Sequence, residues 1–345
     1  MNKKKIILGM SGGVDSSVTA YLLQKEGYEV EGVYMKLHSS SEKYHQENIA
    51  TIKKVCDYLH IKYHILDLEE EFKKEVYDYF IQSYIDGVTP NPCVKCNKTI
   101  KFGSLLEYAK SQGADYLATG HYAKVENGFI KIADDLSKDQ SYFLAQVPRE
   151  ALDYMMFPMS KYQKEDIKKI ASTIPVLEHL ATKKESQEIC FVPTVYTDIL
   201  KEHTQIDKEG KTLDINGNEV GHHKGYMHYT TGKRKGFYVH GAHEPHFVLS
   251  TDKQNNTITV GKKEDLKINT VLADNLNMFT DDKEFKALVK LRYRSPGQMA
   301  QVTIQNGIAT IQLEESAYGV AIGQYAVFYN DDKVIGSGII THANV

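Results

Sequence analysis

The sequence predicts an α/β domain with a parallel sheet, followed by a small central domain and a C-terminal β-barrel. Three observations predict this order. Short apolar strands alternate with helical segments in the first 120 or so residues, a glycine- and serine-rich turn joins the first strand to the first helix, and short β segments bounded by turns fill the C-terminal part. At 345 residues the chain is also too long for one ordinary domain.

Four short apolar runs in the N-terminal part have the length and composition of buried strands. They are residues 4–10, 29–35, 62–68 and 116–119. Segments with a helical apolar period separate or follow them, at residues 15–25, 45–59, 70–86 and 98–112. This alternation is typical of βαβ units, whose parallel sheet is covered by helices on both faces.

The pattern changes in the rest of the chain. Residues 123–132 predict a hairpin beside the main sheet, turning at Asn127-Gly128, and Ser160 with Gln163 predicts a capped helix start. Five turn-bounded segments predict the small barrel: 285–292, 299–305, 308–314, 325–330 and 334–340. We therefore expect a catalytic domain at 1–200, a small irregular or β domain at 201–262 and a barrel at 263–345.

Composition restricts the class of protein. With 41% hydrophobic and 25% charged residues, the chain can bury a sizeable core. Its formal net charge of −3 gives no global sign of nucleic-acid binding, so any RNA contact must come from local patches such as Lys224 and 233–235, which lie among aromatic residues. No apolar stretch is long enough to span a membrane, and four cysteines are too few for a disulfide scaffold. We expect a cytoplasmic protein without a membrane partner.

The strongest local signal is the turn Gly9-Met10-Ser11-Gly12-Gly13-Val14-Asp15-Ser16-Ser17, between the first strand and the first helix. Small residues at such a junction let backbone N–H groups approach an anion, and the helix N-terminus adds partial positive charge. The serines add hydroxyl donors, and Asp15 can hold Mg²⁺ or help to order the loop. The spacing is that of neither a Walker A loop nor a dinucleotide-binding fingerprint.

Three of the four cysteines are candidates for chemistry. Cys93 and Cys96 follow two prolines and precede a predicted helix, and Cys190 lies far along the chain. The position of Cys96 near a helix N-terminus, beside Lys95 and Lys98, predicts a thiolate rather than a thiol. Cys56 lies on the apolar face of a predicted helix and is expected to belong to the core.

The Ser-Gly-Gly-Val-Asp-Ser turn resembles the PP-loop of the ATP pyrophosphatases, which cleave ATP between the α- and β-phosphates. Further segments are similar, in order and nearly from end to end, to those of the tRNA-specific 2-thiouridylases. They are Asn91–Lys98, Ala118–Tyr122, Lys138–Leu144, Ile189–Val192, Thr231–Gly236, Arg292–Arg294 and Gly323–Tyr329. The resemblance implies a PP-loop domain of the adenine nucleotide α-hydrolase type and the ATP-dependent 2-thiolation of the wobble uridine of tRNA.

The resemblance also implies roles for individual residues. Cys190 would carry a persulfide, and Cys96 would attack it to form a transient disulfide. ATP would be surrounded by Gly9, Met10, Ser11, Gly12, Gly13, Val14, Asp15, Ser16, Met35 and Gly120. The tRNA would meet Asn91, Pro92, Cys93, His121, Lys138, Asp139, Gln140, Arg292, Tyr293 and Gln324. The implied partners are tRNAs of the Lys, Glu and Gln type and a sulfur donor, either a cysteine desulfurase or a persulfide relay protein.

One departure leaves two routes open. The family more usually has aspartate, a proposed general base, where this chain has Cys93. Cys93, Cys96 and Cys190 are therefore also candidates for the ligands of a [4Fe–4S] cluster with one open iron. A zinc site is the weaker interpretation, because no fourth ligand completes it. The rival functions are an amide or amidine ligase, which needs no paired cysteines, and a non-enzymatic RNA-binding or iron–sulfur protein, which has no use for a PP-loop.

Overall fold

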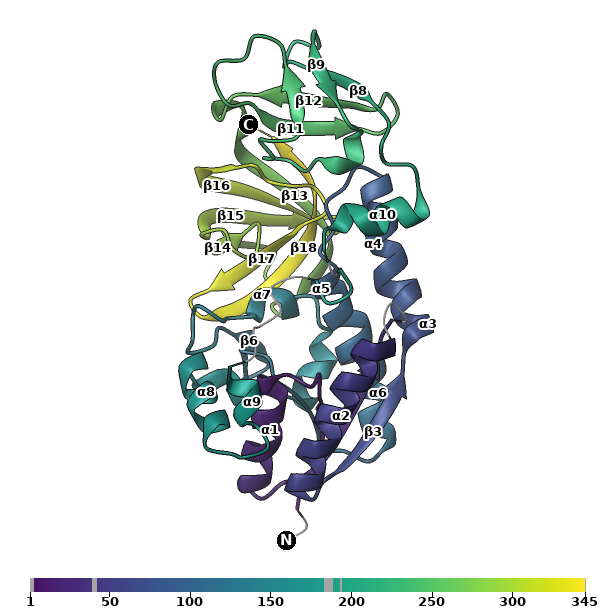
Figure 1. The fold of residues 1–345 in the computed structure, drawn as a ribbon. Helices are drawn as coiled ribbons and strands as arrows, with labels where there is room; N and C mark the ends of the chain where they lie inside the picture. Colours follow the sequence, from purple (N-terminus) through teal and green to yellow (C-terminus); the bar gives the residue numbers. More distant parts are fainter. Residues whose placement is uncertain (1–2, 39–41, 183–188, 193, 345) are drawn as a thin grey trace. The chain divides into compact units, whose positions relative to one another are not determined.

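The computed structural model describes residues 3–38, 42–182, 189–192 and 194–344. The chain forms two compact units (Figure 1). Unit 1 contains Met1–Val76, Cys93–Phe191 and Asp332–Ile335, and unit 2 contains Tyr77–Pro92, Val192–Asp331 and Gly336–Val345. Each unit is therefore assembled from segments that are distant in the sequence.

Unit 1 is built on the predicted parallel sheet. Its strands are β1 (Lys5–Gly9), β2 (Glu29–Lys36), β3 (Lys62–Asp67), β4 (Tyr116–Thr119) and the short β7 (Met155–Met156). They lie in the order β3-β2-β1-β4-β7, and every neighbouring pair is parallel. The sheet was predicted from the alternation of strands and helices, and this prediction is confirmed. With β1 at the centre, the turn that follows it opens at the carboxyl edge of the sheet, where α/β proteins bind ligands.

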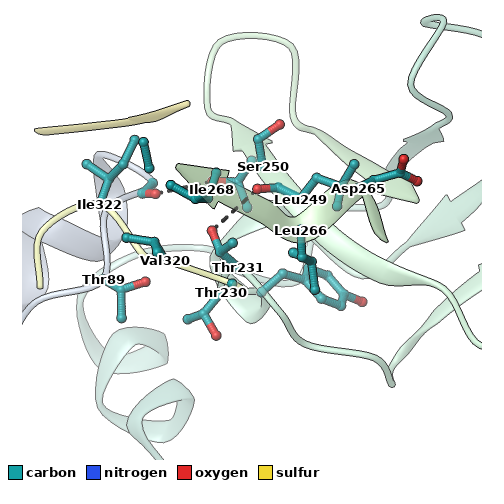
Figure 2. Close-up of a pocket in the computed structure, with 15 residues that line it drawn as sticks. Thr89, Thr230, Thr231, Leu249, Ser250, Asp265, Leu266, Ile268, Val320 and Ile322 are labelled. Atoms are coloured by element: carbon teal, nitrogen blue, oxygen red, sulfur yellow. Dashed lines mark hydrogen bonds between the residues drawn. The ribbon is translucent and has the colours of Figure 1, made fainter. Parts of the chain in front are cut away.

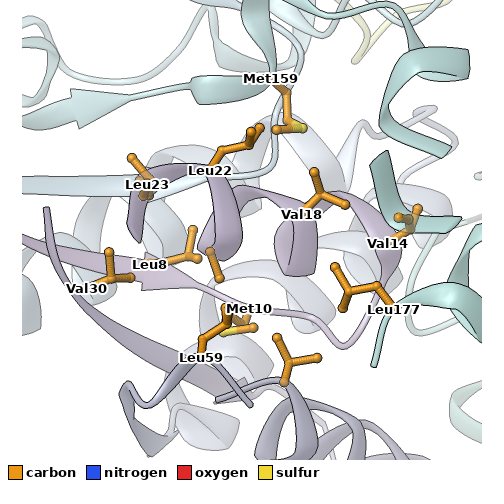
Figure 3. Close-up of a cluster of buried hydrophobic side chains, with 14 of the residues drawn as sticks. Leu8, Met10, Val14, Val18, Leu22, Leu23, Val30, Leu59, Met159 and Leu177 are labelled. Atoms are coloured by element: carbon orange, nitrogen blue, oxygen red, sulfur yellow. The ribbon is translucent and has the colours of Figure 1, made fainter. Parts of the chain in front are cut away.

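The helix α1 (Val14–Lys25) covers the sheet through an apolar face. Val18 and Leu23 of α1 and Leu8 of β1 are fully buried in one cluster (Figure 3). The cluster extends to α2 (Glu42–Leu59) and to α8 (Lys164–Ser172). Gly32 of β2 is needed for this packing, because a Cβ there would lie 2.7 Å from the Met10 sulfur. The core therefore fixes the position of the turn between β1 and α1.

Two predicted helices contain π-helical turns. The segment predicted at 70–86 is α3 (Glu69–Phe72), a π-helix at Lys73–Tyr77 and α4 (Asp78–Ile85). The segment predicted at 98–112 begins earlier, as α5 (Pro92–Cys96), continues as the π-helix η2 (Asn97–Ser104) and ends as α6 (Leu105–Ser111). Apolar periodicity cannot distinguish these turns from α-helix, although π-turns often occur at functional sites.

One local prediction is confirmed and another was wrong. The hairpin of β5 (Lys124–Glu126) and β6 (Phe129–Lys131) forms as predicted, and β6 also pairs with β18 (Lys333–Asn344). Ser160 does not cap a helix: it lies in the 3₁₀ turn Pro158–Lys161, and α8 begins at Lys164. The start of α8 is set by a distant carboxylate, Asp135, which accepts the Lys164 N–H at 2.9 Å.

Unit 2 contains two antiparallel-rich β structures. The first is a sheet in the order β10-β9-β8-β12-β11, formed by β8 (Gly210–Leu213), β9 (Glu219–His223), β10 (Phe237–Val239), β11 (Phe247–Asp252) and β12 (Thr257–Gly261). The second is a barrel of β13 (Lys267–Met278), β14 (Glu284–Lys290), β15 (Gln298–Gln305), β16 (Ile308–Tyr318), β17 (Tyr325–Asn330) and β18. Pairing of β13 with β18 closes the barrel. The sequence did not predict β13, because its first half alternates polar and apolar residues only weakly.

Shorter elements complete the described chain. They are the helices α7 (Ser141–Leu144), α9 (Glu178–Ala181) and α10 (Tyr196–His203) and the 3₁₀ turns Arg149–Tyr154, Tyr226–His228 and Glu264–Leu266. Within the part of the chain that the structure describes, no helix has both the length and the apolar character needed to cross a membrane. The division at residues 200 and 262 stays a prediction.

The core makes a matched stability test possible. We expect Leu23→Ala to lower the free energy of unfolding by about 2–5 kcal/mol, because it removes buried methyl groups and leaves a cavity under α1. Leu136→Ala is the control, since Leu136 is 77% exposed, and it should change the same free energy by less than about 0.5 kcal/mol. Urea unfolding of both variants measures the difference, and equal effects would contradict the assigned core.

Candidate nucleotide and thiol site

The turn after β1 is held in shape by its own serines. The hydroxyls of Ser16 and Ser17 donate to the Gly13 carbonyl at 3.2 and 2.9 Å, and the Ser11 N–H lies 3.3 Å from the Ser16 oxygen. Gly12 has a φ of +77°, a left-handed conformation that favours glycine. The serine hydroxyls therefore order the loop, and the backbone N–H groups other than those of Ser11 and Ser17 are the principal anion donors.

Gly120 packs directly against this loop. A Cβ at Gly120 would lie 3.1 Å from the Ser16 nitrogen and 3.3 Å from the Asp15 carbonyl carbon. Gly120 follows β4, which is the neighbour of β1, so the carboxyl ends of the two strands meet here. Met35 lies near the carboxyl end of β2, on the other side of β1. The residues predicted to surround ATP thus gather along one sheet edge.

Asn48 adds an unsatisfied donor to the loop. It lies on α2, is 6% exposed and has its side-chain oxygen 3.0 Å from where a Cβ of Gly12 would be. Among the described residues its Nδ2 atom has no hydrogen-bond partner. An unpaired buried donor is costly, and the Asn48 side chain also lies close enough to the Tyr34 hydroxyl to influence its pKa, after the larger effect of burial. The loop, the helix N-terminus and this amide therefore fit a bound nucleotide.

Asp15 orders the loop through an ion pair with a buried lysine. Its two carboxylate oxygens each lie 2.7 Å from the Lys164 ammonium, and the Tyr122 hydroxyl donates to Oδ1 at 2.9 Å. The sequence left two roles open for Asp15, and this geometry favours ordering over metal binding. Lys164 and Tyr122 were not predicted as site residues, because neither belongs to a recognisable phosphate motif.

The three candidate cysteines differ in exposure. Cys96 is buried, Cys93 is half-buried and Cys190 is exposed, and none is in a disulfide. Cys93 and Cys96 lie on α5. Cys190 lies near the end of the Cys93–Phe191 segment of the same unit. Desolvation is the main cause that raises the pKa of Cys93 and Cys96, and the charge of Cys190 adds to it at both thiols, as does that of Cys93 at Cys96. The structure therefore brings the three sulfurs into one electrostatic neighbourhood.

The predicted thiolate at Cys96 is wrong for the structure as it stands. Desolvation raises the pKa of Cys96 to about 12 and that of Cys93 to about 11. Cys96 is the last residue of α5, and the helix runs on into η2 instead of beginning there. It therefore lacks the open N–H groups of a helix start.

The two lysines expected to activate Cys96 face other groups. Lys95 pairs with Glu75 at 3.3 Å, and Lys98 donates to the Gln146 side chain at 3.0 Å. Burial raises the pKa of Cys93, Cys96 and Cys190, and the cation that opposes this rise at all three thiols is Lys101. Lys101 was missed, although its spacing of five residues from Cys96 matches the i, i+5 period of a π-helix.

His121 is a neutral imidazole in this site. It is buried, and desolvation, followed by the charge of Lys101, holds its pKa well below the ordinary value. Its Nε2 lies 3.3 Å from the Lys101 ammonium, and its Nδ1 lies 2.6 Å from the Thr119 hydroxyl. Because the ammonium can only donate, Nε2 accepts and Nδ1 carries the proton. His121 thus orients Lys101 rather than adding positive charge.

The other residues of unit 1 predicted to meet tRNA have structural partners. Asp139 is buried and accepts the Ala133 N–H and both the N–H and hydroxyl of Ser141. The Gln140 side chain accepts the Tyr122 N–H at 3.0 Å. Lys138 lies close enough to the Asp135 carboxylate to lower its pKa, after the larger effects of burial and hydrogen bonding. A direct role of these three residues in RNA binding stays a prediction.

The predicted tRNA residues of unit 2 also hold their own unit together. The Gln324 amide donates to the carbonyls of Thr89 and Pro90, at 3.1 and 2.9 Å. These carbonyls immediately precede Asn91 and Pro92, which are buried. Arg292 donates to the Thr231 carbonyl at 3.0 Å, and Tyr293 beside it is half-buried. RNA binding by these residues is likewise untested.

Unit 2 contains a cavity of about 200 Å³, and Thr231, whose carbonyl accepts the Arg292 hydrogen bond, is one of the residues that line it (Figure 2). Hydroxyl groups line much of it, from Thr89, Thr230, Thr231, Ser250 and Thr251. It includes no cysteine and no residue of the turn at 9–17. In the neighbouring basic segment Lys233 turns inward and donates to the His228 carbonyl at 2.7 Å, whereas Lys224, Arg234 and Lys235 are exposed.

Comparison with known proteins gives matches over nearly the whole chain. Residues 4–194 match the family model described as a tRNA methyl transferase HUP domain, residues 197–262 match its PRC-barrel domain, and residues 268–340 match an aminomethyltransferase β-barrel domain. Among solved structures, a 4-thiouridine synthetase–RNA complex with bound ATP is 19% identical, with a TM-score of 0.36, over 55% of this chain and 45% of that one.

Two curated relatives are much closer. The chain is 59% identical to tRNA-specific 2-thiouridylase MnmA 1 of Aliarcobacter butzleri, over 99% of both chains. It is 56% identical to tRNA-specific 2-thiouridylase MnmA of Campylobacter lari, over 97% of this chain and 99% of the relative. With a PP-loop at the sheet edge and matches of this length and identity, the chain belongs to the tRNA-specific 2-thiouridylase family.

Proposed function

We propose that this protein is an ATP-dependent sulfurtransferase that replaces the C2 oxygen of the wobble uridine of tRNA with sulfur. The products are 2-thiouridine, AMP and diphosphate. The observation that carries the proposal is that unit 1 combines a nucleotide-binding loop with three cysteines whose thiols influence one another. An amide ligase of the same fold class would need the loop but not the thiols.

The first step activates the base. The uridine C2 oxygen attacks the α-phosphorus of ATP, diphosphate leaves, and the oxygen becomes part of a good leaving group. The loop N–H groups, the start of α1 and the Asn48 amide would hold the polyphosphate during this step. Water would hydrolyse the adenylated base, so the target uridine must be flipped into a closed site.

The second step transfers sulfur. A sulfur donor, either a cysteine desulfurase or a persulfide relay protein, leaves a sulfane sulfur on Cys190, whose exposed position suits an exchange between proteins. The terminal sulfur attacks C2 and AMP departs. The Cys96 thiolate then attacks the Cys190 sulfur, which frees the thiocarbonyl and forms a Cys96–Cys190 disulfide. An external thiol reductant must reduce that disulfide before the next turnover.

Burial makes the protonation of Cys96 part of the mechanism. With its pKa raised to about 12, Cys96 is a neutral thiol near pH 7 and must lose its proton as it attacks. The Lys101 ammonium opposes this shift by stabilising the thiolate form. A cation beside a desolvated thiol is a common way to raise nucleophilicity. We propose that Lys101 has this function here.

The residues fit the persulfide route better than a [4Fe–4S] cluster. Within the described ranges, no group of three or more His, Cys, Asp or Glu side chains could hold a metal ion. Mg²⁺ would accompany ATP, where it neutralises phosphate charge. Anaerobically purified, reconstituted protein should be colourless and active; stoichiometric iron that is needed for thiolation would contradict this route.

The proposed substrates are tRNAs of the Lys, Glu and Gln type, bound in the cytoplasm where ATP and tRNA are both present. The exposed Lys224, Arg234 and Lys235 would provide phosphate contacts. Within unit 2, Asn91, Pro92, Arg292 and Gln324 would contribute to tRNA binding, and within unit 1 Cys93 would do so. Lys138 and Tyr293 would contact RNA directly.

The proposed function is tested in cells that lack the gene. Mass spectrometry of tRNA nucleosides should find 2-thiouridine lost and then restored by the unsubstituted chain. Cells that carry Cys96→Ser or Cys190→Ser should contain about 10³-fold less 2-thiouridine, or even less, than cells with the unsubstituted chain. Each substitution removes a reacting sulfur. Cys56→Ser is the control, because Cys56 is buried in the core cluster. Normal 2-thiouridine without the gene, or full turnover by both serine variants, would refute the proposal.

A second test addresses Lys101. At pH 8 we expect Lys101→Met to slow the alkylation of Cys190 by iodoacetamide, because loss of the ammonium removes an effect that lowers the pKa of this thiol. Lys101→Arg should retain most of the rate. Lys110→Met is the control, since Lys110 pairs with Glu107 on α6. Mass spectrometry of the labelled peptide gives the rates, and equal rates for the two methionine variants would exclude this role of Lys101.

A further inference from the structure

The PP-loop contains a carboxylate in an unfavourable place for its proposed ligand. Asp15 is in the first turn of α1, with its side chain 31% exposed. A negative charge there suits the helix dipole, but it would repel a polyphosphate bound to the same N–H groups. A loop that binds ATP through its backbone therefore requires something to neutralise this charge.

Lys164 supplies a positive charge that its own helix does not stabilise. It is the first residue of α8, where the helix dipole disfavours a cation. Its side chain is only 5% exposed, and a buried ammonium is costly unless it is paired. Both oxygens of Asp15 lie 2.7 Å from this ammonium, and the Tyr122 ring centroid lies 5.7 Å from it.

Hydrogen bonds of the backbone also fix the position of Lys164. Its N–H donates to Asp135 at 2.9 Å. Asp135 in turn accepts the N–H and the hydroxyl of Ser137, at 3.0 and 2.6 Å. Gly120, at the end of β4, closes the space on the other side of the Asp15 backbone. Segments far apart in sequence, at Gly120 and at Asp135–Ser137, thus help to fix the Lys164 ammonium against the Asp15 carboxylate.

We propose that Lys164 is the internal counter-ion of the PP-loop, a positioning residue that acts on ATP through Asp15. It neutralises the carboxylate, so the loop presents only N–H donors to the polyphosphate. It also holds the first turn of α1 in the orientation that aims these donors. Asp15 then serves as the partner of Lys164 and not as a metal ligand. This inference rests on the proposed use of ATP by the same loop.

A double-mutant cycle tests the inference. Lys164→Met leaves the carboxylate without a cation and should weaken ATP binding about tenfold or more, because like charges then face each other at short range. Asp15→Asn/Lys164→Met removes both charges and should bind ATP within about threefold of the unsubstituted chain. Lys169→Met is the control on α8, since Lys169 is 77% exposed. Isothermal calorimetry with ATP, with and without Mg²⁺, gives the affinities, and urea unfolding reports stability.

The outcomes separate the alternatives. If the double variant binds ATP as poorly as Lys164→Met, Lys164 contacts the phosphates directly and the inference is overturned. The same holds if Lys164→Met binds normally, or if Asp15→Asn alone abolishes the Mg²⁺ dependence. Should Lys164→Met fail to fold, a folded double variant decides: near-normal binding supports the inference and lost binding overturns it. Absence of ATP binding by the unsubstituted chain would instead refute the proposed function.

Discussion

The ion pair between Asp15 and Lys164 is the constraint on which the nucleotide site depends. It joins the start of α1 to the start of α8, across 149 residues of sequence. Tyr122, just after β4, adds its hydroxyl to the same carboxylate. Removing Asp15 would leave the buried Lys164 ammonium without its anion, which is costly in a desolvated position. The loop therefore reaches its binding geometry only when both helix starts and the end of β4 are in place.

Burial of the thiols has one favourable and one unfavourable consequence for the proposed chemistry. Desolvation raises the pKa of Cys93 and Cys96, so the enclosure that would protect an activated base from water also weakens the nucleophiles. Lys101 offsets this effect from within the same helix, and the neutral His121 holds its ammonium without competing for charge. In the proposed chemistry, one cation would serve all three sulfurs in place of a lowered pKa at each.

Many residues associated with RNA in the family also carry structural hydrogen bonds here. Asp139 and Gln140 support the segment around Tyr122 in unit 1, and Gln324 holds the carbonyls of the loop before α5 in unit 2. These side chains can shape an RNA-binding surface by fixing backbone without touching RNA themselves. A motif match therefore identifies a segment, and only the contacts of each side chain indicate what it can do.

The sequence by itself determined the parallel sheet, the PP-loop, the barrel and the candidate cysteines, because alternation of apolar residues and glycine-rich turns are local properties. It did not determine the strand β13, the start of α8 or the π-turns, since these depend on barrel closure, on the distant Asp135 and on packing. Only the tertiary structure decided which cation lies beside which acidic group. Lys164 pairs with Asp15. Lys101 lies beside the thiols, whereas Lys95 and Lys98 face other side chains. Charges interact through space at a few ångströms, and sequence spacing does not encode that distance across folded segments.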